Sequence, residues 1–124
     1  MLTEQLQSLN VSTICEWDVL AFLYRHATSL TTAEHLAHLV GYSKSIVGAA
    51  LDQLAVSGLI QRSPLRNRVR LYRFVDSEDV ARQQCIQELM RLGETRGGRL
   101  LLVQSLRQIA GRRRASAGNS LRLA

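Results

Sequence analysis

Five arginines and no acidic residue lie between residues 58 and 74, in the stretch GLIQRSPLRNRVRLYRF. They are Arg62, Arg66, Arg68, Arg70 and Arg73. A guanidinium group binds phosphate oxygens through paired hydrogen bonds, and neighbouring cations repel one another unless an anion lies among them. The chemistry that this segment predicts is the binding of a polyanion. A solvated hairpin that carries its charge only for solubility is the alternative.

The rest of the positive charge is also concentrated. The chain has 124 residues and a net charge of +6, of which residues 58–74 hold +5 and residues 111–124 hold +4. The remaining residues are therefore net negative. Such segregation of charge is typical of proteins that bind nucleic acid and is not needed for solubility.

Residues that bind metals or carry redox chemistry lack the usual spacing. Cys15 and Cys85 lie far apart, so buried thiols are expected, with a redox switch as the alternative. His35 and His38 are three residues apart and would share a helix face. A metal sensor that also used His26 or Cys15 is the alternative, but a pair of histidines supplies too few ligands to predict one. We expect surface histidines and no cofactor.

Enzymatic and membrane functions have little support. The chain has no glycine-rich phosphate loop and no nucleophile motif, and the acidic cluster of Asp76, Glu78 and Asp79 is explained by the start of a helix. No apolar run is long enough to cross a membrane, and residues 1–10 lack the pattern of a signal peptide. We expect a cytoplasmic protein that is not an enzyme.

The N-terminal third predicts two helices. Leu2, Leu6 and Leu9 have helical spacing, which indicates an amphipathic arm over residues 1–12 that needs a partner surface. Thr13 and Glu16 form a capping box, and the apolar residues that follow predict a core helix to about Ala27. Its aromatic residues, Trp17, Phe22 and Tyr24, are expected in the core rather than in a ligand pocket.

The next segment predicts two short helices joined by a turn. Thr31 and Glu34 form a second capping box, and Gly41 ends that helix. Ser43 caps a third helix, which ends at Gly58. Two short helices around a turn of about four residues form a helix-turn-helix.

After this point the pattern changes to that of a β-hairpin over residues 59–75. The alternation is imperfect, because Val69 and Leu71 fall on one face whereas Tyr72 and Phe74 fall on the other. Either a bulge or a switch from an exposed tip to a buried base explains it.

The C-terminal half predicts two more helices. Ser77 is expected to cap a helix that runs to Gly93. Gly97 and Gly98 break the pattern, a last helix follows over residues 99–110, and residues 111–124 are expected to form a disordered basic tail.

This order of elements resembles the winged helix-turn-helix domain of bacterial transcriptional regulators of the MarR and ArsR kinds. The resemblance covers about residues 13–75 and rests on TTAEHLAHLVGYSKSIVGAALDQLAVSGLI, followed by an arginine-rich strand that ends in YRF. The positions that match the family pattern are Thr31, Ser43, Val47, Leu51, Leu54, Gly58, Leu59 and Ile60. The fold class expected is mainly α with a small β-hairpin, with helices flanking the winged helix-turn-helix at both ends.

The resemblance implies a DNA-binding transcriptional regulator. Helix 43–57 would enter the major groove, and the arginine-rich wing over residues 59–75 would hold phosphates or the minor groove. The implied DNA-binding residues are Thr32, Ser43, Lys44, Ser45, Gly48, Ala49, Gln53, Arg62, Arg66, Asn67, Arg68 and Arg70. The expected partners are double-stranded DNA and a second copy of the chain, and an effector of unknown chemistry is compatible with this function.

The domains expected are an arm (1–12), a winged-helix DNA-binding domain (13–76), a helical dimerisation region (77–110) and the tail (111–124).

One feature favours a rival hypothesis. The recognition helix carries GAALD where such regulators often carry Arg, His or Asn. The rival is a winged helix that serves as a protein-interaction module in a larger assembly and does not read DNA.

Overall fold

The computed structural model describes the backbone of residues 2–123 and the side chains of residues 2–111. These residues form six helices and one three-stranded antiparallel sheet. In chain order the elements are α1 (Leu2–Ser8), α2 (Ile14–Arg25), β1 (Thr31–Thr32), α3 (Ala33–Val40), α4 (Lys44–Val56), β2 (Ile60–Arg62), β3 (Leu71–Phe74), α5 (Val80–Gly93) and α6 (Arg96–Leu123). The expectation of a mainly helical fold with a small hairpin is confirmed. None of the helices in the described chain is long and apolar enough to span a membrane.

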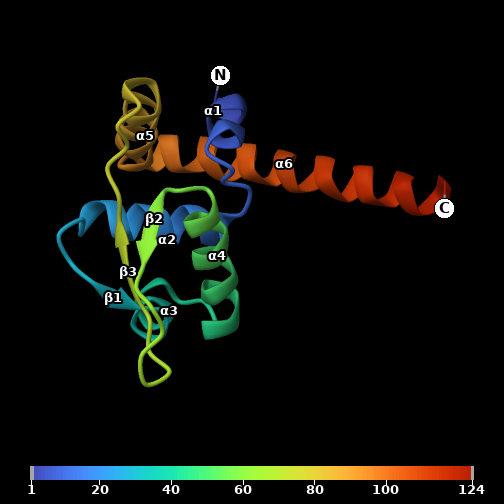
Figure 1. Ribbon diagram of the computed structural model, residues 1–124. Coiled ribbons are helices and arrows are strands. Elements are labelled where there is room, and N and C mark those ends of the chain that lie inside the picture. The colour runs from blue at the N-terminus through green and yellow to red at the C-terminus, as the bar shows by residue number, and fades with distance from the viewer. Residues whose placement is uncertain (1, 124) are drawn as a thin grey trace.

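The elements form two groups (Figure 1). Helices α2, α3 and α4 surround the sheet, while α6 runs past this body with α1 and α5 beside it. The hairpin of β2 and β3 projects from the body on the side away from α6. This arrangement leaves the tip of the hairpin and one face of α4 uncovered.

Several helices begin or end at the capping residues that the sequence predicts. The Thr13 hydroxyl accepts from the Glu16 amide at 3.0 Å, and the Ser43 hydroxyl accepts from the Ile46 amide at 3.2 Å. Gly41 ends α3 with a left-handed φ of 81°. These caps satisfy amides and carbonyls that have no partner within the helix.

Two predicted caps are wrong by one or two residues. Thr32, not Thr31, caps α3 by accepting from the His35 amide at 3.1 Å, because Thr31 is drawn into the sheet opposite Tyr72. Asp79, not Ser77, caps α5 and accepts from the amides of residues 81 and 82. The Ser77 hydroxyl instead accepts from the Asp79 amide, which forms a turn ahead of the helix.

The sheet has the strand order β1-β3-β2. The hairpin predicted for residues 59–75 is present, with Ile60 opposite Phe74. Tyr72 and Phe74 face the core, whereas Val69 is 48% exposed near the tip. The switch from an exposed tip to a buried base therefore explains the imperfect alternation.

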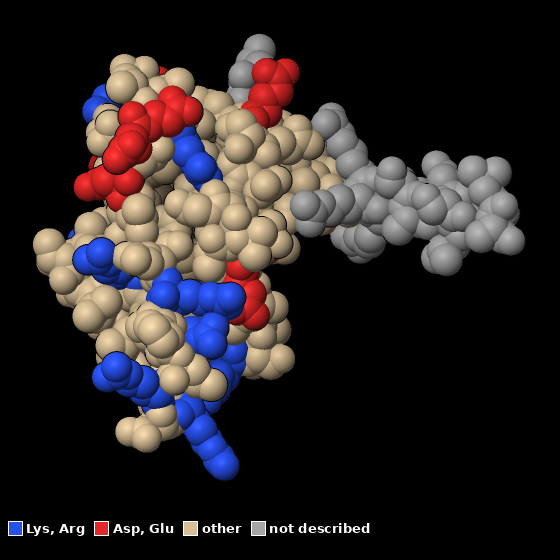
Figure 2. Space-filling model, viewed as in Figure 1, with Lys and Arg blue, Asp and Glu red and all other residues tan. Residues whose placement is uncertain are grey.

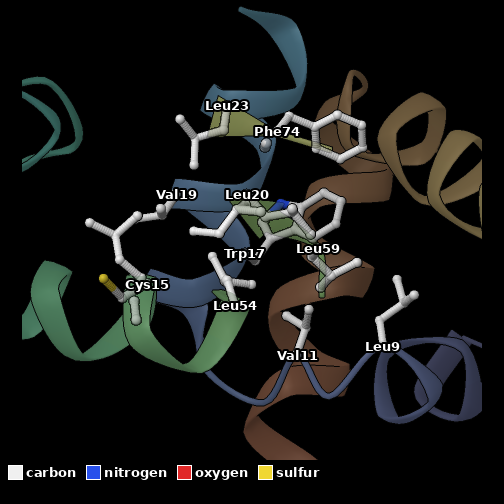
Figure 3. Close-up of a cluster of buried hydrophobic side chains, with 14 of the residues drawn as sticks. Leu9, Val11, Cys15, Trp17, Val19, Leu20, Leu23, Leu54, Leu59 and Phe74 are labelled. Carbon is white, nitrogen blue, oxygen red and sulfur yellow. The ribbon is translucent and has the colours of Figure 1, made fainter. Parts of the chain in front are cut away.

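The core is centred on α2 (Figure 3). Trp17 is 2% exposed and lies among Leu20, Leu54, Leu59 and Phe74, as expected of a core residue. The other two aromatic residues of α2 are partly buried against this core, and the Tyr24 ring meets Phe74 edge to face at 5.1 Å between centroids. Burial of each large side chain of this kind stabilises the fold by about 1.5–3 kcal/mol.

The partner surface of α1 belongs to the same chain. Leu6 and Leu9 are almost fully buried, and α1 packs against α6. Because a seven-residue helix is marginal in isolation, this contact stabilises it.

The extent of α6 differs from the prediction at both ends. Gly97 and Gly98 lie inside α6, because Thr95 accepts from the Gly98 amide at 3.0 Å and so starts the helix earlier. Residues 111–123 continue α6, in the segment for which the sequence predicts a disordered basic tail. Arginine, alanine and leucine are good helix formers, and the two glycines of this segment, Gly111 and Gly118, each cost about 1 kcal/mol relative to alanine. Side chains from residue 112 onward lie outside the described residues.

Candidate nucleic-acid interface

The tip of the hairpin is a tight two-residue turn. Asn67 and Arg68 have positive φ values of 51° and 64°, and Arg66 and Val69 exchange backbone hydrogen bonds of 3.0 and 2.8 Å across them. Two successive residues with positive φ define a type I′ turn, whose twist matches that of the flanking strands. This turn holds Arg66 and Arg68 at the exposed end of the hairpin.

The cations of the hairpin differ in their partners. Arg62 forms an ion pair with Asp52 of α4 at 3.2 Å, and Arg73 donates two hydrogen bonds to Gln61. Among the residues that the structure describes, the side chains of Arg66, Arg68 and Arg70 make no ion pair or hydrogen bond. Three of the five arginines are therefore available to an anion.

A shallow cleft brings some of these cations together. It lies between the hairpin and the first residues of α3 and α4, with a volume of about 220 Å³. Its lining includes Thr32, Glu34, Lys44, Arg68, Arg70 and Tyr72. Lys44 is the first residue of α4, where the helix dipole adds a partial positive charge. Three cations, one carboxylate and the N-termini of two helices give the cleft a net positive potential.

Charge is unevenly distributed over the visible face of the molecule (Figure 2). Lysine and arginine gather over the hairpin and the adjoining end of the body, whereas most of the acidic side chains in this view lie at the opposite end, over α5. The cations that lie close together in the sequence therefore also lie close together on the surface of the folded protein.

The outward face of α4 is poor in hydrogen-bonding groups. Val47, Leu51 and Leu54 face the core. The side chains on the opposite, exposed face are Ser45, Ala49, Asp52 and Val56, and Lys44 and Ile46 are exposed at its first turn. Two of these, Ile46 and Val56, are apolar and 52% and 81% exposed. No motif in the sequence marks these two residues, although their offset from the buried positions indicates exposure.

The structure divides the predicted site residues. Thr32, Lys44, Arg68 and Arg70 line the cleft, Arg66 and Asn67 lie at the hairpin tip, and Ser45 and Ala49 face outward from α4. The others are less available. Ser43 uses its hydroxyl as a cap, as Thr32 also does at the edge of the cleft. Gly48 and Gln53 are half-buried, and Arg62 is paired with Asp52.

Other reactive side chains lie away from this surface. Cys15 is buried as expected, and burial, followed by the charges of Asp18 and Glu16, raises its pKa to about 11. Cys85 is half-buried, and the three histidines are exposed. Within the described part of the chain, no group of three or more His, Cys, Asp or Glu side chains is arranged to hold a metal ion.

Comparisons of the chain with protein-family models, with curated proteins and with solved structures found no match.

Proposed function

We propose that this protein is a DNA-binding transcriptional regulator built on a winged helix-turn-helix. In this proposal α4 is the recognition helix in the major groove, and the hairpin over residues 59–75 is the wing. The observation that carries the proposal is the set of unpaired cations of the hairpin, of which Arg68 and Arg70 line the cleft at the N-terminus of α4 and Arg66 lies at the hairpin tip. A DNA backbone supplies the regularly spaced anions that such a set requires.

The shapes of the two elements support this proposal. An α-helix with an exposed face fits the width of the major groove. The two-residue turn makes the tip of the wing narrow, and its arginines are suited to phosphates or to the negative potential of a narrow minor groove. Lys44, the first residue of α4, lines the same cleft as Arg68 and Arg70 of the wing and would contact a phosphate at the edge of the major groove.

The same geometry predicts more affinity than sequence selectivity. On the outward face of α4, Ser45 offers a hydroxyl and Ala49 a methyl group that fits against thymine. Because phosphate contacts carry no direct sequence information, most of the binding free energy would come from the wing. Selectivity would then depend on the shape and deformability of the DNA.

We further propose that the protein acts as a homodimer through its C-terminal helices. Leu100 and Leu101 of α6 are 59% and 51% exposed, and Val80 at the start of α5 is 63% exposed. A second copy related by a two-fold axis would cover such apolar side chains and present two α4 helices to a palindromic site.

A second candidate function is protein interaction. Leu39 of α3 is 48% exposed and joins Ile46 and Val56 as apolar side chains on the helix-turn-helix. Exposed apolar groups of this kind are typical of protein interfaces. In this alternative the proposed wing contributes charge complementarity to an acidic partner.

Fluorescence anisotropy titrations with duplex DNA at several salt concentrations test the first function. We expect binding that weakens steeply with salt, because bound cations release counterions from DNA. Replacing Arg66, Arg68 and Arg70 together with alanine should abolish most of this affinity and reduce the salt slope by roughly three. The matched control replaces three exposed arginines on α2, α5 and α6, namely Arg25, Arg91 and Arg107, and should bind nearly as the native protein does.

Several outcomes would contradict the proposal. The wing does not bind DNA if the native protein fails to bind at low salt, or if its DNA affinity does not depend on salt concentration. Equal losses of DNA affinity in the two triple variants would also exclude binding by the wing. Selection of bound duplexes from a random pool tests the dimer, since a two-fold site enriches palindromes. If the native protein captures a protein partner but does not bind duplex DNA at low salt, the interaction module is favoured.

A further inference from the structure

The N-terminal end of α4 is tied to the C-terminal helices through one carboxylate. Tyr42 lies in the turn directly before the cap of α4, and its hydroxyl donates to Oδ2 of Asp18 at 2.9 Å. The other oxygen of Asp18, Oδ1, accepts from Nη1 of Arg99 in α6 at 2.9 Å. The Asp18 side chain is only 17% exposed and belongs to α2, so it bridges two segments far apart in the sequence.

The C-terminal end of α4 has a second tie. Arg82 of α5 donates from Nη2 to the carbonyl oxygen of Ser57, the residue that caps α4. A cation at this place satisfies a carbonyl that lacks a helical partner and complements the negative end of the helix dipole. Gly58 follows in a left-handed conformation that turns the chain toward β2.

We propose that α5 and α6 clamp α4 at both ends, and that Asp18 and Arg82 are positioning residues that set its orientation for DNA. This inference rests on the proposed function, because it assigns α4 the groove contact. A helix in a groove requires a defined orientation, and apolar contacts are non-directional, so they oppose small rotations less than directional polar contacts do. Polar contacts at both ends restrict such movement.

The electrostatics of the bridge agree with this role. Burial, followed by the hydrogen bond to Asp18, raises the pKa of Tyr42 to about 12, so its hydroxyl stays protonated and keeps donating at neutral pH. The same carboxylate raises the pKa of Arg99, which keeps the guanidinium charged. Both donors of the bridge therefore keep their protons at neutral pH.

The clamp couples the C-terminal helices to the orientation of α4, the helix that we propose contacts DNA. Arg82 and Arg99 belong to the helices that we propose for dimerisation. Arg82 contacts the C-cap of α4 directly, and Arg99 is linked through Asp18 to the residue before the N-cap of α4. A change in α5 or α6 that draws either arginine away would free one end of the recognition helix. DNA affinity would then depend on residues that contact no DNA.

Three variants of the full chain test the clamp. Asp18→Asn removes the charge from the bridge, Tyr42→Phe removes one hydrogen bond with little change of shape, and Arg82→Gln removes the second tie. The matched control is Glu88→Gln, which weakens an exposed contact between Gln5 of α1 and Glu88 of α5 that does not reach α4. Circular dichroism and thermal melting establish that each variant is folded.

Hydrogen–deuterium exchange of the α4 amides and DNA titration provide two separate measurements. Exchange should accelerate at the first turn of α4 in Asp18→Asn and Tyr42→Phe, and at its last turn in Arg82→Gln, with no change in the control. DNA affinity of the folded variants should fall roughly fivefold or more, which is the usual range for coupling between distant sites. In Arg99→Gln the further effect of Tyr42→Phe should be smaller than in the native background, because both act through Asp18.

The two proposals fail in different ways. If native protein does not bind duplex DNA, the proposed function is wrong, and the exchange experiment still decides whether α4 is clamped. If exchange of α4 is unchanged in folded variants, or if they bind DNA as tightly as the control does, the clamp is wrong and the DNA-binding function stands.

Discussion

Asp52, on the outward face of α4, forms an ion pair with Arg62 of β2, with 3.2 Å between Oδ1 and Nη1. The pair joins the proposed recognition helix to the proposed wing on the surface that would face DNA. Both side chains are well exposed, so the contact contributes little to stability. Its effect on an approaching polyanion is larger, since Asp52 repels phosphate and occupies one of the five wing arginines.

The first prediction concerns this pair. Asp52→Asn should strengthen DNA binding by roughly twofold to tenfold and make the salt slope steeper by about one, because Arg62 becomes free to contact phosphate. The free energy of unfolding should change by less than about 1 kcal/mol. Anisotropy titrations and urea unfolding measure the two effects, with Glu94→Gln at the end of α5 as a charge-matched control. Weaker binding by Asp52→Asn would show instead that this carboxylate contacts the bases.

The second prediction compares two adjacent threonines. The Thr31 hydroxyl is buried and has no hydrogen-bond partner among the described residues, whereas the Thr32 hydroxyl caps α3. Thr31→Val should raise the free energy of unfolding by up to about 1 kcal/mol, because it removes a desolvated hydroxyl from a strand. Thr32→Val should lower it by about 1 kcal/mol through loss of the cap. Urea unfolding checks both, and equal effects at the two positions would contradict the observed boundary between β1 and α3.

The third prediction concerns alkaline pH. Folding raises the pKa of Cys15 from 9.0 to about 11 and that of Tyr42 from 10.0 to about 12. Above pH 9 the unfolded chain releases these protons before the folded chain does, so the stability that they contribute is present below pH 9 and is lost as the pH rises to about 12. Cys15→Ala should flatten this decline between pH 9 and 11, and Tyr42→Phe between pH 10 and 12. Unfolding midpoints measured at several pH values above 9 test both expectations, with Cys85→Ala as the control.

Sequence patterns predicted much of the fold because many of its determinants are local. A cap needs a hydroxyl two or three residues ahead of a free amide, and Thr13 and Ser43 meet that condition within a few residues. The left-handed glycines at positions 41 and 58 end α3 and α4 for the same local reason. The cationic hairpin was equally visible, since its arginines are close together in the chain.

Other features depend on contacts across the chain. Strand β1 is only two residues long and exists because Thr31 meets Tyr72, which also shifts the start of α3 to Ala33. The extent of α6 was hidden by glycines and by a basic composition that is shared by helices and disordered tails.

The candidate site likewise depends partly on local sequence and partly on contacts across the chain. The sequence by itself determined where the cations gather and which residues begin the proposed recognition helix, because charge and capping are properties of short segments. Only the tertiary structure decided which cations remain free, since Asp52 lies ten residues from Arg62 and reaches it through the packing of α4 on the sheet. It alone also joined Asp18 to Tyr42 and Arg99, which are 24 and 81 residues away, because hydrogen bonds at such separations require the whole fold to bring their atoms together.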